Sequence, residues 1–315
     1  MSLMKKRNKN PVRTQARTVS LVLGSGGARG LAHIGVIREL EARGYEVRAI
    51  AGSSMGALVG GIYALGELET YADWVQGLSQ SDVLGLLDWS FAGGGLIRGD
   101  KLIRKLRDLV GERDIEHLPI HFTAVAVDIE RGREVWMSEG SLFDAIRASI
   151  AIPAVFTPHR YQGRTLVDGG LLNPVPVAPT LRTFTDLTIV VDVNGPAPET
   201  EDGAQAGSGE GEGEEDRQGL LERMRGYVES LGGEGSPRAA EGMALSEVLM
   251  RSLDTMQAAI TRQHLAVFRP DLVISVPKNV CMIHEFHRAR PVIELGQRLA
   301  RENLEGMAQR APSRI

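Results

Sequence analysis

The first 65 residues contain the same unit twice: a short apolar run, a glycine-rich turn and a helix-forming stretch. The first unit runs from the strand-like "TVSLVL" of residues 18–23 through "GSGGARG" to "LAHIGVIRELEARG". The second runs from "VRAIA" of residues 47–51 through "GSSMG" to an apolar stretch over residues 55–65. Strands that alternate with helices across short glycine turns predict an α/β fold. We expect a mostly parallel central sheet that is sandwiched by helices in three α/β/α layers.

The same alternation continues along the chain. Further helix and strand signals lie at residues 101–110, 121–128, 164–168, 187–193, 243–268, 270–277 and 292–309. Because strand signals resume late in the chain, we expect one domain over residues 18–305 rather than two.

Three segments are expected to lie outside this packing. Residues 1–17 are basic and lack the apolar run of a signal peptide, so they are interpreted as a disordered tail, with weak binding to anionic lipid as the alternative. Residues 196–218 are rich in Glu, Asp and Gly and nearly free of apolar side chains, which predicts a disordered acidic insertion. Residues 306–315 are assigned to a C-terminal tail.

The composition excludes several classes of protein. Hydrophobic residues make up 43% of the chain and charged residues 24%, with a formal net charge of −4, so nucleic acid is not the expected partner. The single cysteine, Cys281, rules out an intrachain disulfide framework and favours a reducing compartment. We therefore expect a cytoplasmic protein; contact with the inner face of a membrane and the oligomeric state stay open.

The turn "GSSMG" has the spacing G-x-S-x-G, with Ser54 between Gly52 and Gly56. A nucleophile elbow places a serine on a strained turn between a strand and a helix, and it needs small neighbours because a Cβ there would collide with the adjacent chain. Strand, turn and helix are all present in this sequence. An ordinary Gly/Ser turn that packs a helix on a sheet stays open at this point.

The earlier turn "GSGGARG", residues 24–30, can gather backbone N–H groups into an anion-binding nest. A dinucleotide-binding loop and an oxyanion hole are the two candidates. The fingerprint G-x-G-x-x-G is not matched, and the second strand ends in glycine and serine rather than an acidic ribose ligand. Two parallel neighbouring strands would bring both glycine turns to one edge of the sheet. The pattern therefore favours an oxyanion hole.

A serine nucleophile needs a base. None of the seven histidines follows an acidic strand end in a convincing order, and "HEFH" at residues 284–287 is one residue short of a zinc-binding helix motif. Asp168 is the better candidate, because "RTLVD" is strand-like and the following "GG" permits a tight turn at the rim. A capping role for Asp168 in that turn is the alternative.

Together these motifs resemble the patatin-like phospholipases: "GSGGARG", then "GSSMG", then "SIAIPAVFTP" at residues 149–158, then "VDGGLLNPVPV". The resemblance covers residues 18–195 and 245–305. It implies a lipid acyl hydrolase that uses a Ser–Asp dyad without histidine, metal or cofactor, and whose substrate is a lipid or fatty-acyl ester.

The resemblance also assigns roles to residues. It implies that Ser54 is the nucleophile, that Asp168 is the general base, and that an oxyanion hole is formed by the backbone of Gly26, Gly27, Ala28 and Arg29. The N–H groups of Gly27 and Ala28 would stabilise the oxyanion. Ser25 departs from the family pattern, where glycine is common, but serine is small enough to fit.

Two other functions remain as alternatives: an esterase with a Ser–Asp–His triad, and a catalytically silent regulatory protein that retains the fold. Residues 78–99, rich in Leu, Trp and Gly, are interpreted as core packing with a loop. The alternative for this segment is a mobile apolar flap over an acyl pocket.

Overall fold

The computed structural model describes residues 17–90, 97–197 and 245–310. The expected tail up to residue 16, residues 198–218 of the expected insertion and residues 91–96 of the possible flap lie outside the described residues. The chain separates into two compact units, residues 1–197 with 253–315, and residues 198–252. The sheet and the candidate site belong to the first unit.

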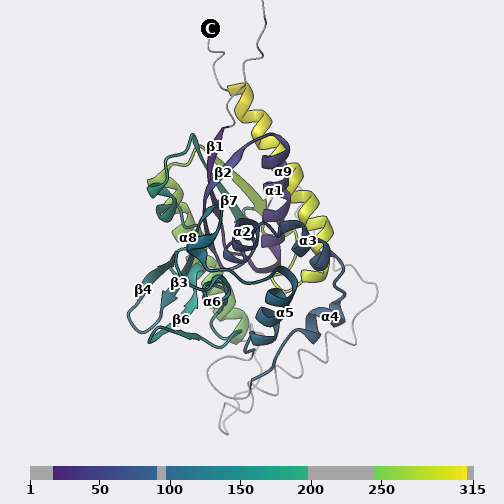
Figure 1. The fold of residues 1–315 in the computed structure, drawn as a ribbon, viewed down its shortest axis with the longest axis vertical. Coiled ribbons are helices and arrows are strands. Elements are labelled where there is room, and N and C mark those ends of the chain that lie inside the picture. The colour runs from purple at the N-terminus through teal and green to yellow at the C-terminus, as the bar shows by residue number, and fades with distance from the viewer. Residues whose placement is uncertain (1–16, 91–96, 198–244, 311–315) are drawn as a thin grey trace, which may run out of the picture. The chain divides into compact units, whose positions relative to one another are not determined.

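The first unit is built on one mixed sheet (Figure 1) with the strand order β5-β6-β3-β2-β1-β7-β8, and β4 pairs with β3 in addition. The strands are β1 Thr18–Leu23, β2 Glu46–Ser53, β3 His121–Asp128, β4 Arg133–Met137, β5 His159–Tyr161, β6 Arg164–Asp168, β7 Leu187–Gly195 and β8 Leu272–Pro277.

Four neighbouring pairs run parallel: β1 with β2, β1 with β7, β2 with β3, and β7 with β8. The predicted mostly parallel sheet is therefore confirmed. The pairs β3–β4, β3–β6 and β5–β6 are antiparallel. The sequence pattern gives no sign of these antiparallel pairs, and β6 is the strand that ends at Asp168.

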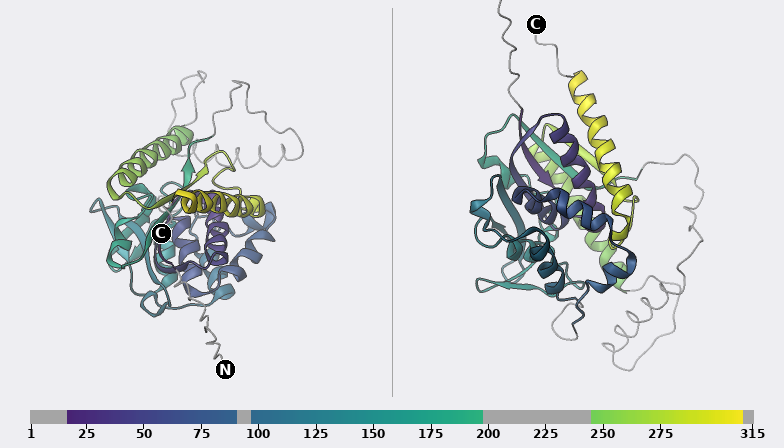
Figure 2. Two further views of the ribbon diagram at one scale, coloured as in Figure 1. Left: turned by 90° about the horizontal axis from the view of Figure 1, so that it is seen from above. Right: turned by 45° about the vertical axis from the view of Figure 1, so that its right-hand side comes forward.

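Side chains of the sheet enter two separate cores, one on each face. In β1, Val19, Leu21 and Leu23 face the larger core, to which α1, α2, α6 and α9 contribute. Val22 points to the opposite face, where a smaller core contains valines of the segment before β7 and is covered by Leu265 and Phe268 of α8. Helices thus lie on both faces of the sheet (Figure 2), as the alternating sequence pattern predicts.

The α-helices are α1 Ala32–Ala42, α2 Met55–Leu65, α3 Leu68–Gln76, α4 Gln80–Gly85, α5 Asp100–Val110, α6 Leu142–Ser149, α8 Leu245–Phe268 and α9 Ala289–Arg310. Short 3₁₀ turns are η1 Gly27–Leu31, η2 Ile115–His117, η3 Gly169–Leu171, η4 Ala178–Arg182 and η5 Phe286–Arg288. The helix α9 corrects one expected boundary: residues 306–310 continue this helix instead of starting the C-terminal tail.

Across the described ranges, no helix is both long enough and apolar enough to cross a bilayer. Cys281 is buried and unpaired in the loop after β8.

Candidate active site

The turn after β1 is fixed at its entrance by contacts with distant parts of the chain. The Gly24 amide donates to the Val191 carbonyl at 3.0 Å, and the Ser25 amide donates to the Pro174 carbonyl at 2.9 Å. The Gly24 carbonyl accepts a hydrogen bond from His33 Nε2 at 2.9 Å. Burial lowers the pKa of His33 to about 4, so the ring is neutral at physiological pH. The start of the loop is therefore held from three sides.

The middle of this turn differs from the expected oxyanion hole at one residue. Gly27 has a φ of +57°, and the Ala28 amide donates to the Ile283 carbonyl at 2.9 Å. The Ala28 N–H is thus already occupied and cannot also serve an oxyanion without losing that bond. In the described part of the chain, no hydrogen bond uses the amides of Gly26 or Gly27. The amides of Gly26 and Gly27 are therefore available as donors.

Arg29 packs its side chain back onto the same turn. The guanidinium is buried, its Nε donates to the Gly26 carbonyl at 3.2 Å, and burial lowers its pKa. Because the Gly26 carbonyl and the Gly27 N–H belong to one planar peptide group, this bond also orients the Gly27 amide. The Arg29 side chain therefore stabilises the conformation of the turn through the Gly26 carbonyl.

The second turn has the backbone geometry of a nucleophile elbow. Ser54 lies between β2 and α2 with φ +54° and ψ −122°, a backbone conformation that residues other than glycine rarely adopt. A Cβ on Gly52 would lie 2.4 Å from the Gly56 carbonyl oxygen, and a Cβ on Gly56 would lie 2.0 Å from the Leu23 carbonyl oxygen. Glycine is therefore required at both flanking positions, as the sequence analysis expects.

The amide of Ser54 is hydrogen-bonded by a side chain for which the sequence pattern predicts no role. It donates to Ser149 Oγ at 2.9 Å, and Ser149 Oγ donates to the Val125 carbonyl at 2.6 Å. Ser149 is the last residue of α6 and is fully buried. The signal that could have found it is the motif "SIAIPAVFTP", which begins at this serine.

Asp168 lies near Ser54 because β6 pairs with the same edge of β3 as β2. The pairing with β6 begins where the pairing with β2 ends. Val125 pairs with Ser53 of β2 and with Trp136 of β4, and the next residue, Ala126, pairs with Asp168 of β6 and again with β4. Since β4 occupies one edge of β3 from Ala124 to Asp128, β2 and β6 must share the other edge there. The last residue of β2 and the last residue of β6 thus stand at successive positions along one strand.

The Asp168 carboxyl group is buried beside the elbow. Its Oδ1 accepts the Gly170 amide at 2.7 Å, and its main-chain amide donates to the Ala151 carbonyl at 2.9 Å. Burial raises the pKa of Asp168 to about 7, while the Ser54 hydroxyl and the Gly170 amide act in the opposite direction. Oδ2 has no hydrogen-bond partner among the described residues, although the Ser54 hydroxyl influences the pKa of this carboxyl group.

The family model of the patatin-like phospholipases matches residues 21–181, which include both glycine turns, Ser149 and Asp168. The chain belongs to the patatin-like phospholipase family.

Similar proteins include relatives with and without a full-length match. An uncharacterized NTE family protein of Mycobacterium tuberculosis, Rv1063c, is 41% identical over 328 residues, which cover 91% of this chain and 91% of that protein. The lysophospholipase nte1 of Emericella nidulans is 31% identical over 195 residues, or 59% of this chain and 12% of that protein. Among solved structures, VipD from Legionella pneumophila aligns with 93% of this chain and 67% of its own, at 15% identity and a TM-score of 0.45.

The histidines of this patatin-like chain make other contacts. All seven belong to the described ranges, and none of the hydrogen bonds of those ranges joins a histidine to Ser54 or Asp168. His33 is bound to Gly24, and His159 lies 3.4 Å from Asp144. No histidine contributes to the pKa of Asp168 either.

One group of potential metal ligands occurs among the described residues. Single ligand atoms of Asp114, Glu116 and His117 lie within 4.8 Å of one another, and all three side chains are exposed. Glu116 already accepts the Gly140 amide at 2.8 Å. The two histidines of "HEFH" do not join this group. Exposed acidic side chains often lie this close without a metal, so the cluster does not define a metal centre.

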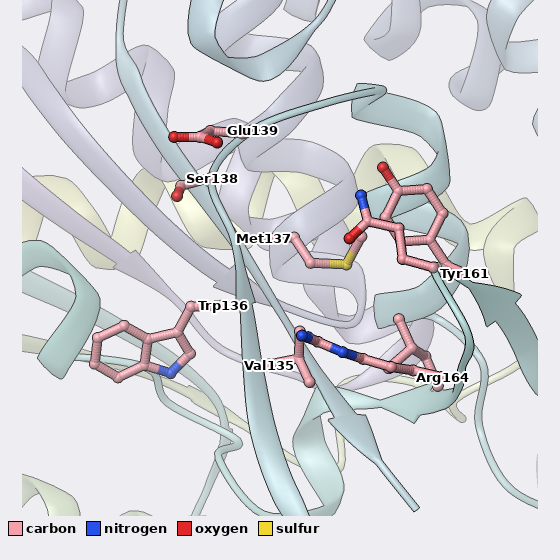
Figure 3. A pocket seen from close by; sticks show the side chains of 9 residues that line it. Val135, Trp136, Met137, Ser138, Glu139, Tyr161 and Arg164 are labelled. Carbon is pink, nitrogen blue, oxygen red and sulfur yellow. The ribbon is translucent and has the colours of Figure 1, made fainter.

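A pocket of about 290 Å³ opens between β4 and the β5–β6 hairpin (Figure 3). Val135, Met137 and Leu166 give it an apolar lining, and Tyr161 and Arg164 stand on the side of the hairpin. Neither Ser54 nor Asp168 lines it. The pocket lining is therefore distinct from the site formed by Ser54 and Asp168.

Proposed function

We propose that this chain is a serine hydrolase that cleaves carboxylic esters of lipids with a Ser54–Asp168 dyad and without a histidine. The observation that carries the proposal is the meeting of the strained Ser54 with a buried carboxyl group at one edge of β3. Membership in a family of lipid acyl hydrolases supports the choice of reaction.

In the first half of the reaction, Asp168 Oδ2 accepts the proton of the Ser54 hydroxyl while Oγ attacks the ester carbonyl carbon. The carbonyl π electrons move to the oxygen, and the N–H groups of Gly26 and Gly27 stabilise the resulting negative charge. The tetrahedral intermediate then collapses, the ester C–O bond breaks, and the leaving alcohol takes the proton from Asp168. An acyl group remains on Ser54.

In the second half, Asp168 accepts a proton from a water molecule that attacks the acyl carbon. The fatty acid leaves, and Ser54 Oγ recovers the proton. A pKa of about 7 suits Asp168 to this task, because a base whose pKa lies near the working pH can accept a proton and also return it. An ordinary carboxylate with a pKa near 4 would be a much weaker base.

The test compares two adjacent serines. Ser54→Ala is expected to lower turnover of a p-nitrophenyl ester and of lysophosphatidylcholine by at least about a thousandfold. Ser53→Ala is the matched control, because Ser53 is equally buried and its hydroxyl has no hydrogen-bond partner among the described residues. Lysophosphatidylcholine is the first lipid to assay because one relative is named a lysophospholipase.

Three outcomes would contradict the proposal. Substantial turnover by Ser54→Ala would remove Ser54 as the nucleophile. Substantial turnover by Asp168→Asn at pH 7 would point to a histidine triad instead. A wild-type protein that neither hydrolyses these esters nor reacts with a fluorophosphonate probe would be a catalytically silent member of the family.

A further inference from the structure

We propose that Ser149 is a positioning residue that holds Ser54 in its reactive conformation and sets its place relative to Asp168. The inference rests on the proposed function, because it concerns the same nucleophile. It starts from two hydrogen bonds of one buried hydroxyl: Ser149 Oγ accepts the Ser54 amide at 2.9 Å and donates to the Val125 carbonyl at 2.6 Å.

The conformation of Ser54 needs an active restraint. A residue with a side chain at φ +54° and ψ −122° is strained, and such strain persists only where the surroundings impose it. The flanking glycines permit the turn, because any Cβ at Gly52 or Gly56 would collide with the backbone, but their lack of a side chain cannot hold it in place. The bond from the Ser54 amide to Ser149 is the contact in the described structure that fixes the main chain of Ser54 from outside the elbow.

The direction of the two bonds is fixed. The Val125 carbonyl can only accept, so Ser149 Oγ must direct its proton to Val125 and present a lone pair to the Ser54 amide. The hydroxyl thus links an amide at the exit of β2 to a carbonyl of β3. Because Val125 is the residue of β3 that pairs with Ser53, the link stands where the ladder between the two strands ends.

The same short segment also holds the base. The Asp168 amide donates to the carbonyl of Ala151, only two residues after Ser149. One turn at the end of α6, residues 149–151, therefore accepts the main-chain N–H groups of both members of the proposed dyad. The buried side chains of α6, among them Phe143 and Ile146, anchor this turn in the larger core. A shift of this turn would move nucleophile and base together, whereas loss of the Ser149 hydroxyl releases only the nucleophile.

The test measures kcat and KM for Ser149→Ala on a p-nitrophenyl ester in the full-length protein. Without the acceptor, the Ser54 main chain can relax, and Oγ loses its alignment with Oδ2 and the ester carbonyl. We expect kcat to fall on the order of a hundredfold with KM within about twofold, since misalignment by about 1 Å has costs of this size.

Ser20→Ala is the matched control. Ser20 is a buried serine of β1, and its hydroxyl is hydrogen-bonded to the Thr185 hydroxyl at 2.8 Å. Neither of these hydroxyls is hydrogen-bonded to the elbow. Both variants lose one buried hydroxyl, but only Ser149→Ala should lose kcat. Should Ser149→Ala fail to fold, Ser149→Cys carries the same comparison, because its thiol is close in shape but a weak hydrogen-bond acceptor.

Hydrogen exchange of the Ser54 amide supplies a second measurement that does not depend on activity. We expect faster exchange at Ser54 in Ser149→Ala than in wild type or Ser20→Ala. Equal kcat and equal exchange in Ser149→Ala and Ser20→Ala would overturn the inference. If the wild type shows no Ser54-dependent turnover, the proposed function fails by itself. Exchange then decides whether Ser149 holds the elbow.

Discussion

Ser54 and Asp168 lie at the same edge of β3 but on strands of opposite direction. The fold is destabilised at each of the two residues for a different physical reason. Ser54 arrives on a parallel strand and turns sharply with a positive φ, so its cost is conformational. Asp168 arrives on an antiparallel strand with an ordinary φ of −50°, but its carboxyl group is buried, so its cost is electrostatic. The site thus combines conformational strain at Ser54 with a buried carboxyl group at Asp168, and a single substitution can remove either one.

The largest effect should come from a change that breaks the geometry on the side of Ser54. Gly56→Ala would place a Cβ 2.0 Å from the Leu23 carbonyl oxygen and 2.5 Å from its carbonyl carbon, so α2 and the end of β1 would have to separate. We expect a loss of roughly 3 kcal/mol in the free energy of unfolding, measured by urea denaturation, together with loss of fluorophosphonate labelling.

Gly85→Ala is the control for this variant, because a Cβ at Gly85 would meet nothing within 4 Å. It should keep both stability and labelling. A Gly56→Ala variant as stable as Gly85→Ala would show that the close approach of α2 to β1 is not required.

The second effect isolates the electrostatic cost at Asp168. The pKa of Asp168 is raised from 3.8 to about 7 in the folded protein, so the folded state binds the proton more tightly than the unfolded state between these values. Wild-type stability should therefore fall as the pH rises from about 4 to about 7. Asp168→Asn removes this dependence and should stabilise the protein at pH 8, with little effect at pH 4.

Asp128→Asn tests the sign of this effect. Arg131, as a hydrogen-bond partner, holds the pKa of Asp128 below its usual range, so its ionised form is favoured by folding. That variant should lose stability at pH 8, not gain it. A fall in stability for Asp168→Asn at pH 8 would mean that the Asp168 charge is not a cost to the fold.

The smallest effect isolates the conformational cost at Ser54. Ser54→Gly relieves the positive φ without adding atoms, and we expect its free energy of unfolding to exceed that of Ser54→Ala, which lacks the same hydroxyl, by about 1 kcal/mol at every pH. Ser54→Ala keeps a Cβ in the same strained turn and should not gain this increment, although both variants lose activity. Equal stability of the two variants would place the strain elsewhere.

Much of this corner could be predicted from the sequence because its parts are local. The residues of β1, β3, β6 and α2 match the predicted segments, since each is a short apolar run bounded by glycine or a charged residue. The requirement for glycine at Gly52 and Gly56 follows from the same local geometry. The order of the motifs was enough to indicate the family.

What the sequence pattern missed depends on contacts between distant segments. The direction of β6 and the place of Asp168 beyond the end of β2 arise only when β4 occupies the other edge of β3. The Ala28 amide was expected to be free, but its partner, Ile283, lies in a loop near the other end of the chain. The hydrogen bond between Ser149 and Ser54 likewise joins two distant motifs, and neither motif alone predicts the contact.

The hydrogen bond from the Ala28 amide to Ile283 has a consequence for synthesis of the protein. A growing chain that has emerged as far as β6 already contains both Ser54 and Asp168, but the loop that should receive the oxyanion still lacks the tie to Ile283. The strand before that tie, β8, can join the sheet only after β7 is in place. Under the proposed function, Ser54 and Asp168 are therefore synthesised well before the Ile283 loop that binds the Ala28 amide, and hydrolytic competence is expected only after that loop has been made.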